Sequence, residues 1–292
     1  MWERLVVGYD GTDEGDDAMT LARVLAAAGG GEVIAACVRP LPHFRRGDGE
    51  LRRTLEDEAG STLAAIHGSG IDTRPLVARS PAQGLFELAE SDQADLLVVG
   101  SSHRGGLGAV LAGGVGRALL QGAPCAVAVA PRGYRDGDVD RLRVIGVGYD
   151  GTAESETALE GAIRLGLAAE TTMRVVTVVA PSSAGDGGSG RAPREPSARD
   201  LMRERLNEAI ERCPRELRAL GQMLTGSVTA SLCDEAERGM DILLVGSRGF
   251  GPLMRVAVGS VAAELMRSAP CPVLVFPRGD GGPPGRSGER TA

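Results

Sequence analysis

The sequence predicts an α/β protein made of two tandem domains of the doubly wound, Rossmann-like class. Two observations predict it. Apolar runs of strand length alternate with segments of helical spacing, and a set of short motifs occurs twice in the same order. A chain of 292 residues also exceeds what one core usually organises, and its 42% of apolar residues can supply two cores. We therefore expect each half to carry a parallel sheet with helices on both faces.

Three segments of the first half recur in the second. The recurring pairs are Val7–Thr12 with Val147–Thr152, Ala94–Ser101 with Met240–Ser247, and Ala123–Val129 with Ala269–Val275. The first pair is identical letter for letter, and the same spacing separates Gly100 from Cys125 and Gly246 from Cys271. The extra residues of the second half fall near 182–200, in a segment whose composition predicts a loop.

These repeats set the expected domain limits. The first domain is expected at 1–133 and the second at 141–278, with a polar linker at 133–140 between them. Residues 279–292 are rich in Gly, Pro and Arg, so we expect a disordered tail there.

The elements of the first half follow from periodicity. Strands are expected at 5–7, 32–38, 73–78, 95–100 and 125–129, and helices at 51–67, 83–91 and 115–121. A further helix before the second strand places Ala18, Leu21, Ala22 and Leu25 on one face. Gly122 suits the C-terminal cap of the last helix, and Pro124 prevents its extension. The second half repeats this order, and right-handed crossovers then favour an open doubly wound sheet.

Composition excludes several function classes. A formal net charge of -7 argues against nucleic acid or an anionic membrane as the main partner. All 32 basic residues are Arg, so neither a P-loop lysine nor a Schiff-base lysine is available. The five cysteines show no C-x-x-C pair and no zinc spacing, and we expect them to be reduced. The start of the chain does not resemble a signal peptide and no apolar stretch reaches membrane length, which predicts a cytoplasmic protein.

A ligand-binding site is expected where the strands end, because open α/β sheets bind ligands at the carboxyl ends of their strands. In the second half Asp150 follows the first strand and Gly246 ends the fourth. From Gly246 the chain continues as G-x-x-G-x9-G-S, and Gly259-Ser260 opens a helix. Glycines allow a close approach of the backbone to an anion, and the first amides of a helix donate to phosphate. Asp10 and Asp150 also precede helices, so a role in capping and a role in ligand contact both remain open.

The order of elements, the Asp-Gly-Thr after the first strand, the glycine loop and the Ala-Pro-Cys-Pro-Val-Leu-Val ending together resemble the universal stress protein family. The resemblance covers both halves over nearly their whole length. It implies a five-stranded parallel sheet of order 3-2-1-4-5 in each half, ATP binding in one subclass, pairing of domains through the fifth strand, and a regulatory role in stress survival.

The resemblance also implies site residues. In the second half these are Gly148, Asp150, Val179, Val245, Gly246, Arg248, Gly249, Gly259, Ser260 and Val261. Asp150 would face the adenosine part, Val179 and Val245 would line the adenine pocket, and most of the others would hold ribose and phosphates. The counterparts in the first half are Gly8, Asp10, Val38, Val99, Gly100, Ser102, His103, Gly113, Gly114 and Val115. There the second glycine of the loop is replaced by His103 and the helix-opening hydroxyl is missing, which puts phosphate binding in that half in doubt.

Three hypotheses follow for the function. The first is a regulatory protein of the stress response that binds ATP or another adenine nucleotide, with or without Mg²⁺. The second is a nucleotide-free interaction scaffold whose two domains pair through residues 125–130 and 271–276, with a homodimer as a further option. The third is an enzyme, such as a slow ATPase, for which we find no paired acid and base and no nucleophile beside a base. We assign no catalytic residue and no metal ligand.

Overall fold

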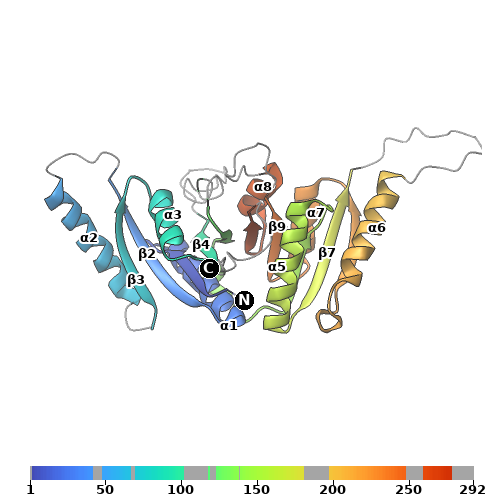
Figure 1. The fold of residues 1–292 in the computed structure, drawn as a ribbon, viewed down its shortest axis with the longest axis horizontal. Coiled ribbons are helices and arrows are strands. Elements are labelled where there is room, and N and C mark those ends of the chain that lie inside the picture. Colours follow the sequence, from blue (N-terminus) through green and yellow to red (C-terminus); the bar gives the residue numbers. More distant parts are fainter. Residues whose placement is uncertain are drawn as a thin grey trace, which may run out of the picture.

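The computed structural model describes residues 2–41, 48–66, 70–101, 118, 123–137, 139–180, 197–247 and 259–277 (Figure 1). The expected helix at 115–121 lies outside these residues except for Ala118, and the expected tail at 279–292 and most of the loop at 182–200 lie outside them as well.

Within the described residues, the first half contains the expected strands and the expected helices before β5 in the expected order; the expected helix at 115–121 stays a prediction. Its strands are β1 (Arg4–Gly8), β2 (Glu32–Pro40), β3 (Asp72–Ala78), β4 (Leu96–Gly100) and β5 (Ala126–Ala130). Its described helices are α1 (Asp13–Gly29), α2 (Gly49–Leu63), which continues into the 3-10 turn η1 (Ala64–Ile66), and α3 (Pro81–Ser91). Local chemistry sets these limits: the Thr12 side chain caps α1, and Gly30, with φ 77°, ends it in the left-handed conformation that glycine tolerates.

The second half repeats the pattern. Its strands are β6 (Val144–Gly148), β7 (Thr172–Val179), β8 (Leu220–Thr225), β9 (Ile242–Gly246) and β10 (Val273–Phe276). Its described helices are α5 (Ala153–Ala169), α6 (Ala198–Glu211), α7 (Val228–Glu237) and α8 (Ser260–Ser268), with the 3-10 turns η2 (Tyr134–Asp136) before β6 and η3 (Arg215–Leu217) before β8. None of the described helices combines the length and the apolar character that a membrane span requires.

The sheet confirms the predicted class and strand order. The strands follow the order β3-β2-β1-β4-β5-β10-β9-β6-β7-β8, so each half is a parallel sheet of order 3-2-1-4-5. At the centre β5 and β10 pair antiparallel, with Val129 opposite Val273 and Val127 opposite Val275, and one ten-stranded mixed sheet results. Helices cover both faces of this sheet (Figure 1).

Two apolar cores lie on opposite faces of the sheet. One gathers side chains of α1, α2, α5 and α6 and includes Leu21 and Leu165, so it draws on both halves. The other gathers side chains of α3, α7 and α8 and includes Leu85, Leu232 and Leu265. Strands β4 and β9 are buried except for their last residue, as expected for central strands of a parallel sheet.

The segment expected to be a polar linker is partly docked on α1. The buried Asp17 carboxylate accepts hydrogen bonds from the backbone N–H groups of Gly133 at 2.8 Å and Arg135 at 2.9 Å. Tyr134 between them is buried in the core. The connection between the halves is therefore held in place by a buried carboxylate and an aromatic side chain.

The two halves place large and small residues in opposite ways at one packing position between a helix and a strand. A Cβ atom on Gly161 of α5 would collide with the ring of Phe276 in β10. At the corresponding positions of the first half stand Leu21 and Ala130, both fully buried. A large strand residue thus faces glycine in one half, and the corresponding positions of the other half hold a small strand residue and a leucine, as close packing of the interior would require.

This difference in packing predicts a compensating pair of substitutions. Phe276→Ala leaves a cavity and should cost about 3–5 kcal/mol of the free energy of unfolding. Adding Gly161→Leu should restore part of that loss, since the pair then matches the first half. Chemical denaturation of the single and double variants measures both effects. Gly161→Leu alone should destabilise the protein, and a double variant less stable than Phe276→Ala would contradict this account of the packing.

Candidate functional site

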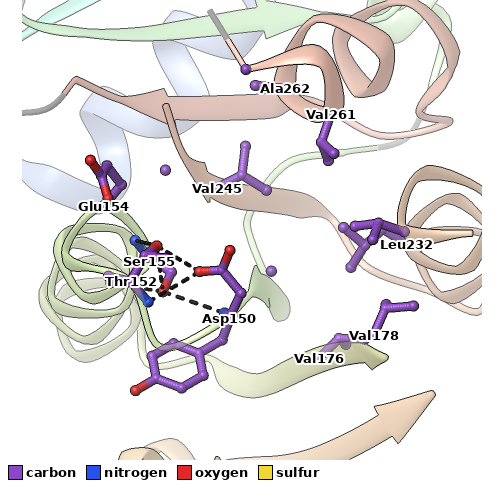
Figure 2. Close-up of a pocket in the computed structure, with 15 residues that line it drawn as sticks. Asp150, Thr152, Glu154, Ser155, Val176, Val178, Leu232, Val245, Val261 and Ala262 are labelled. Atoms are coloured by element: carbon purple, nitrogen blue, oxygen red, sulfur yellow. Dashed lines mark hydrogen bonds between the residues drawn. The ribbon is translucent and has the colours of Figure 1, made fainter. Parts of the chain in front are cut away.

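A cleft with a volume of about 100 Å³ opens at the carboxyl ends of the second-half strands. It lies between β6, β7 and β9 and the first turns of α5, α7 and α8 (Figure 2). Its lining residues are Gly148, Tyr149, Asp150, Thr152, Glu154, Ser155, Val176, Val178, Val228, Leu232, Val245, Gly246, Gly259, Val261 and Ala262. Six of the sequence-predicted residues are among them: Gly148, Asp150, Val245, Gly246, Gly259 and Val261.

One wall of the cleft is aliphatic. It is formed by Val176 and Val178 of β7, Leu232 of α7, Val245 of β9 and Val261 of α8 (Figure 2). This wall contains no charged group, so it suits a flat, weakly polar part of a ligand.

Val179, which we expected at the adenine pocket, is not among the described lining residues. Val178 takes that place together with Val176, because residues two apart in a strand share one face. The sheet register explains the difference. Gly8 pairs with Ala36 and Gly148 pairs with Val176, so Val38 and Val178, each two residues further along the strand, are counterparts.

The opposite side of the cleft carries the turn between β6 and α5. The Asp150 carboxylate accepts hydrogen bonds from the Thr152 N–H at 3.2 Å and from the Thr152 hydroxyl at 2.6 Å. The Thr152 hydroxyl oxygen in turn accepts from the Ser155 N–H at 3.3 Å, so Thr152 is the N-cap of α5. Asp150 therefore orients the capping threonine and lines the cleft at the same time (Figure 2).

Gly246 has a packing role that the sequence did not indicate. A Cβ atom on Gly246 would collide with the backbone carbonyl of Glu154, in the first turn of α5. Gly148 is less restricted, since its Cβ would lie 3.1 Å from a Val245 methyl group and 3.3 Å from a Leu232 methyl group. The bare backbone of Gly246 lets α5 lie against the end of β9, which closes one side of the cleft.

Helix α8 begins at the rim of the cleft. Gly259 precedes it in an extended conformation (φ -61°, ψ 142°) and provides no side-chain cap, so the first N–H groups of the helix are not satisfied by a capping side chain. Gly259 and Val261 line the cleft, whereas the exposed Ser260 is not among the described lining residues. Arg248 and Gly249 lie outside the described residues.

The first half has the same turn. Asp10 accepts from the Thr12 N–H at 3.1 Å and from the Thr12 hydroxyl at 2.6 Å, and a Cβ atom on Gly100 would collide with the Glu14 carbonyl. Gly8 and Val99 lie next to each other, as Gly148 and Val245 do. Val38 differs from Val178 in its surroundings, because Gly84 of α3 comes so close that a Cβ there would lie 2.7 Å from a Val38 methyl group. Ser102, His103, Gly113, Gly114 and Val115 lie outside the described residues.

Behind the cleft, the Tyr149 ring belongs to the core on the side of α5 and α6. Burial, followed by the hydrogen bond from its hydroxyl to Glu156, raises the pKa of Tyr149 to about 12.

The part of the chain that the structure describes holds no cluster of three or more His, Cys, Asp or Glu side chains suited to a metal ion.

The model of the universal stress protein family matches residues 1–131 and again 141–277. The chain belongs to the universal stress protein family. Among characterised sequences, a universal stress protein of Mycobacterium tuberculosis is 29% identical over 294 residues, covering 94% of this chain and 99% of that protein. Another family member, from Mycolicibacterium smegmatis, is 30% identical over 219 residues, covering 73% and 71%.

Solved structures of the family show the same arrangement. The crystal structure of a universal stress protein from Archaeoglobus fulgidus superposes with a TM-score of 0.64 at 20% identity, covering 94% of this chain and 98% of that one. At this identity the likeness concerns the fold alone. It agrees with two Rossmann-like domains in tandem.

Several lining residues were missed by the sequence argument. Thr152, Glu154 and Ser155 belong to the first turn after the recurring motif, and Val228 and Leu232 come from α7, whose contact with the cleft depends on tertiary packing. Thr152 could have been found, since a threonine directly before a helix is a common N-cap. The α7 residues have no comparable pattern in the sequence.

The glycine contacts predict unequal effects of adding one methyl group. Gly246→Ala should lower the free energy of unfolding by about 3 kcal/mol, because rigid backbone of α5 stands in the way. Gly148→Ala should cost less, since its neighbours are the ends of flexible side chains. Urea denaturation of both variants provides the measurement. Equal losses would show that the backbone contact at Gly246 does not restrict this position.

Proposed function

We propose that the second domain of this universal stress protein binds an adenine nucleotide, with ATP, alone or with Mg²⁺, as the principal ligand, and that occupancy regulates a partner surface in the stress response. One observation carries the proposal: an aliphatic slot, a carboxylate and the start of a helix meet in one cleft at the carboxyl ends of the strands. This is the position where open α/β sheets bind nucleotides.

Each part of the cleft suits a different part of the ligand. The slot formed by Val176, Val178 and Leu232 would take the base, because aliphatic side chains favour a flat ring over water. The Asp150 carboxylate is an acceptor and would take a hydrogen bond from an amino or hydroxyl group of the nucleoside. The N–H groups that follow Gly259 would donate to phosphate oxygens, supported by the dipole of α8.

We assign no dedicated enzymatic reaction to the cleft. Asp150 is already engaged with the Thr152 N–H and hydroxyl, so its described hydrogen bonds serve the turn. Slow hydrolysis of bound ATP would be a side activity. The regulatory event is binding itself.

The pairing of β5 with β10 supports a second part of the proposal, that the two domains act as an intrachain pseudo-dimer through strand five. It also supports the scaffold hypothesis, in which the paired domains act without nucleotide, and a homodimer would extend the same principle to a second chain. A cytoplasmic location completes the proposal, and the five free cysteines support it because reducing compartments keep thiols unpaired.

Matched substitutions in the two halves test nucleotide binding. Gly259→Val places a branched side chain where phosphate would approach, and we expect Mg-ATP affinity to fall at least about tenfold, or about 1.4 kcal/mol. Gly113→Val changes the corresponding residue of the first half and should leave the affinity of the second-half site unchanged. Isothermal titration calorimetry measures both.

Circular dichroism spectra provide the control that each variant keeps its fold. Wild-type affinity in Gly259→Val would show that the start of α8 does not hold phosphate. A wild-type protein that neither retains an adenine compound on purification nor binds Mg-ATP would favour the scaffold hypothesis.

A further inference from the structure

The turn that carries Asp150 is tied to α6 by a chain of three side chains. The Tyr149 hydroxyl donates to one Glu156 carboxylate oxygen at 2.5 Å, and the Arg212 guanidinium donates to the other at 2.6 Å. Arg212 directly follows the last residue of α6. The residue before Asp150 is thereby joined to the C-terminal end of that helix.

The corresponding chain in the first half leads elsewhere. There the Tyr9 hydroxyl donates to Asp16 at 3.2 Å, and the Asp16 carboxylate pairs with Arg135 at 3.1 Å. Arg135 belongs to η2, in the connection between the domains. The same tyrosine and carboxylate are thus tied to the interdomain connection in one half and to α6 in the other.

A second contact joins α6 to the residue after Asp150. Gly151 adopts the left-handed conformation, with φ +71°, and a Cβ atom there would lie 2.7 Å from Arg205 Cδ and 3.1 Å from Arg205 Nη1. Arg205 lies in the middle of α6 and packs across the turn. In the first half, a Cβ atom on Gly11, with φ +78°, would meet a Thr62 methyl group at 3.0 Å and, apart from its neighbours in the chain, no other side chain or backbone atom of the described residues within 4 Å.

The backbone at this point has little freedom to adjust on its own. The Tyr149 N–H donates to the Val176 carbonyl at 2.9 Å, and the Tyr149 carbonyl accepts from the buried Thr177 hydroxyl at 2.9 Å. Tyr149 itself is buried. Asp150 therefore stands between a residue fixed to β7 and a glycine covered by Arg205, and Arg205 and Arg212 add contacts of α6 to both sides of Asp150.

We infer that α6 is the supporting element of the nucleotide cleft, with Arg205 and Arg212 as positioning residues that hold the Asp150 turn in its binding geometry. Coupling between two sites is reciprocal, so a nucleotide that engages Asp150 stabilises α6 in return. Helix α6 lies beside β7 and most of its residues are exposed, which makes its outer face the surface that changes with occupancy (Figure 1). The inference rests on the proposed nucleotide site.

The test combines affinity with local hydrogen exchange. Mg-ATP titration and amide exchange with and without saturating Mg-ATP are measured on the full chain, for wild type, Arg212→Gln, Arg212→Lys and Arg205→Ala. Arg203→Gln is the control on the same helix, where Arg203 lines a shallow hollow of the outer face. Arg135→Gln is the matched control that cuts the equivalent chain in the first half.

In wild type we expect nucleotide to slow exchange in α6 as well as at the ends of β9 and the start of α8. Arg212→Gln and Arg205→Ala should weaken affinity about fivefold and lose the slowing in α6 while keeping it around the cleft. Arg212→Lys should recover part of the affinity, and both controls should behave as wild type. If an arginine only stabilised α6, its replacement would raise amide exchange in α6 in both states and leave the slowing by nucleotide unchanged.

The outcomes separate the two proposals. Nucleotide that binds wild type without slowing exchange in α6, or variants that bind and respond as wild type does, would overturn the inference and leave the nucleotide site standing. A wild-type protein that binds no adenine nucleotide would overturn both.

Discussion

The site depends on one contact between backbones, that of Glu154 in α5 with Gly246 at the end of β9. Because Gly246 has no side chain, the first turn of α5 lies directly against the strand, and the turn with Asp150 then faces the aliphatic side chains of β7, α7 and α8. A larger residue would push α5 away and open the cleft on that side. The first half makes the same contact between Glu14 and Gly100, so the contact belongs to the backbone arrangement that both domains share.

Although the two domains share this backbone arrangement, they differ in core packing and in the side-chain links of the motif tyrosine. The second half has Phe276 against Gly161, and the first half has the buried Ala130 and Leu21 at the corresponding positions. A large residue and a small one are thus interchanged, as close packing would require. The tyrosine of the recurring motif is linked through Asp16 to Arg135 of the connection in the first half, and through Glu156 to Arg212 beside α6 in the second. The first domain is thereby tied to the connection between the halves, and the second domain is tied to its own outer helix. This difference is consistent with the proposal that the second half responds to a nucleotide.

The recurring motifs were sufficient to predict two open doubly wound domains with a cleft at the carboxyl ends of their strands, because parallel strands, short connections and right-handed crossovers leave few alternatives. The strand order 3-2-1-4-5 was implied by the resemblance to the family, and the sheet has it. Val179 shows where such reasoning stops. The end of β7 is apolar at successive positions, and without the register against β8 nothing in the sequence tells which valine faces the cleft. The contacts of Arg205 and Arg212 were not predictable either, since exposed arginines on a charged helix carry no spacing that links them to a distant turn. The linker was expected from its polar composition, yet Tyr134 is buried because Asp17 satisfies the backbone on either side of it.

The most direct test of the account is a crystal structure of the full chain grown with Mg-ATP. The account predicts density in the second-half cleft, with the adenine ring against Val178 and Leu232, a hydrogen bond to Asp150, and phosphate at the N-terminus of α8. A cleft filled by the protein's own side chains at saturating nucleotide, together with flat titrations against adenylates at millimolar concentration, would contradict it.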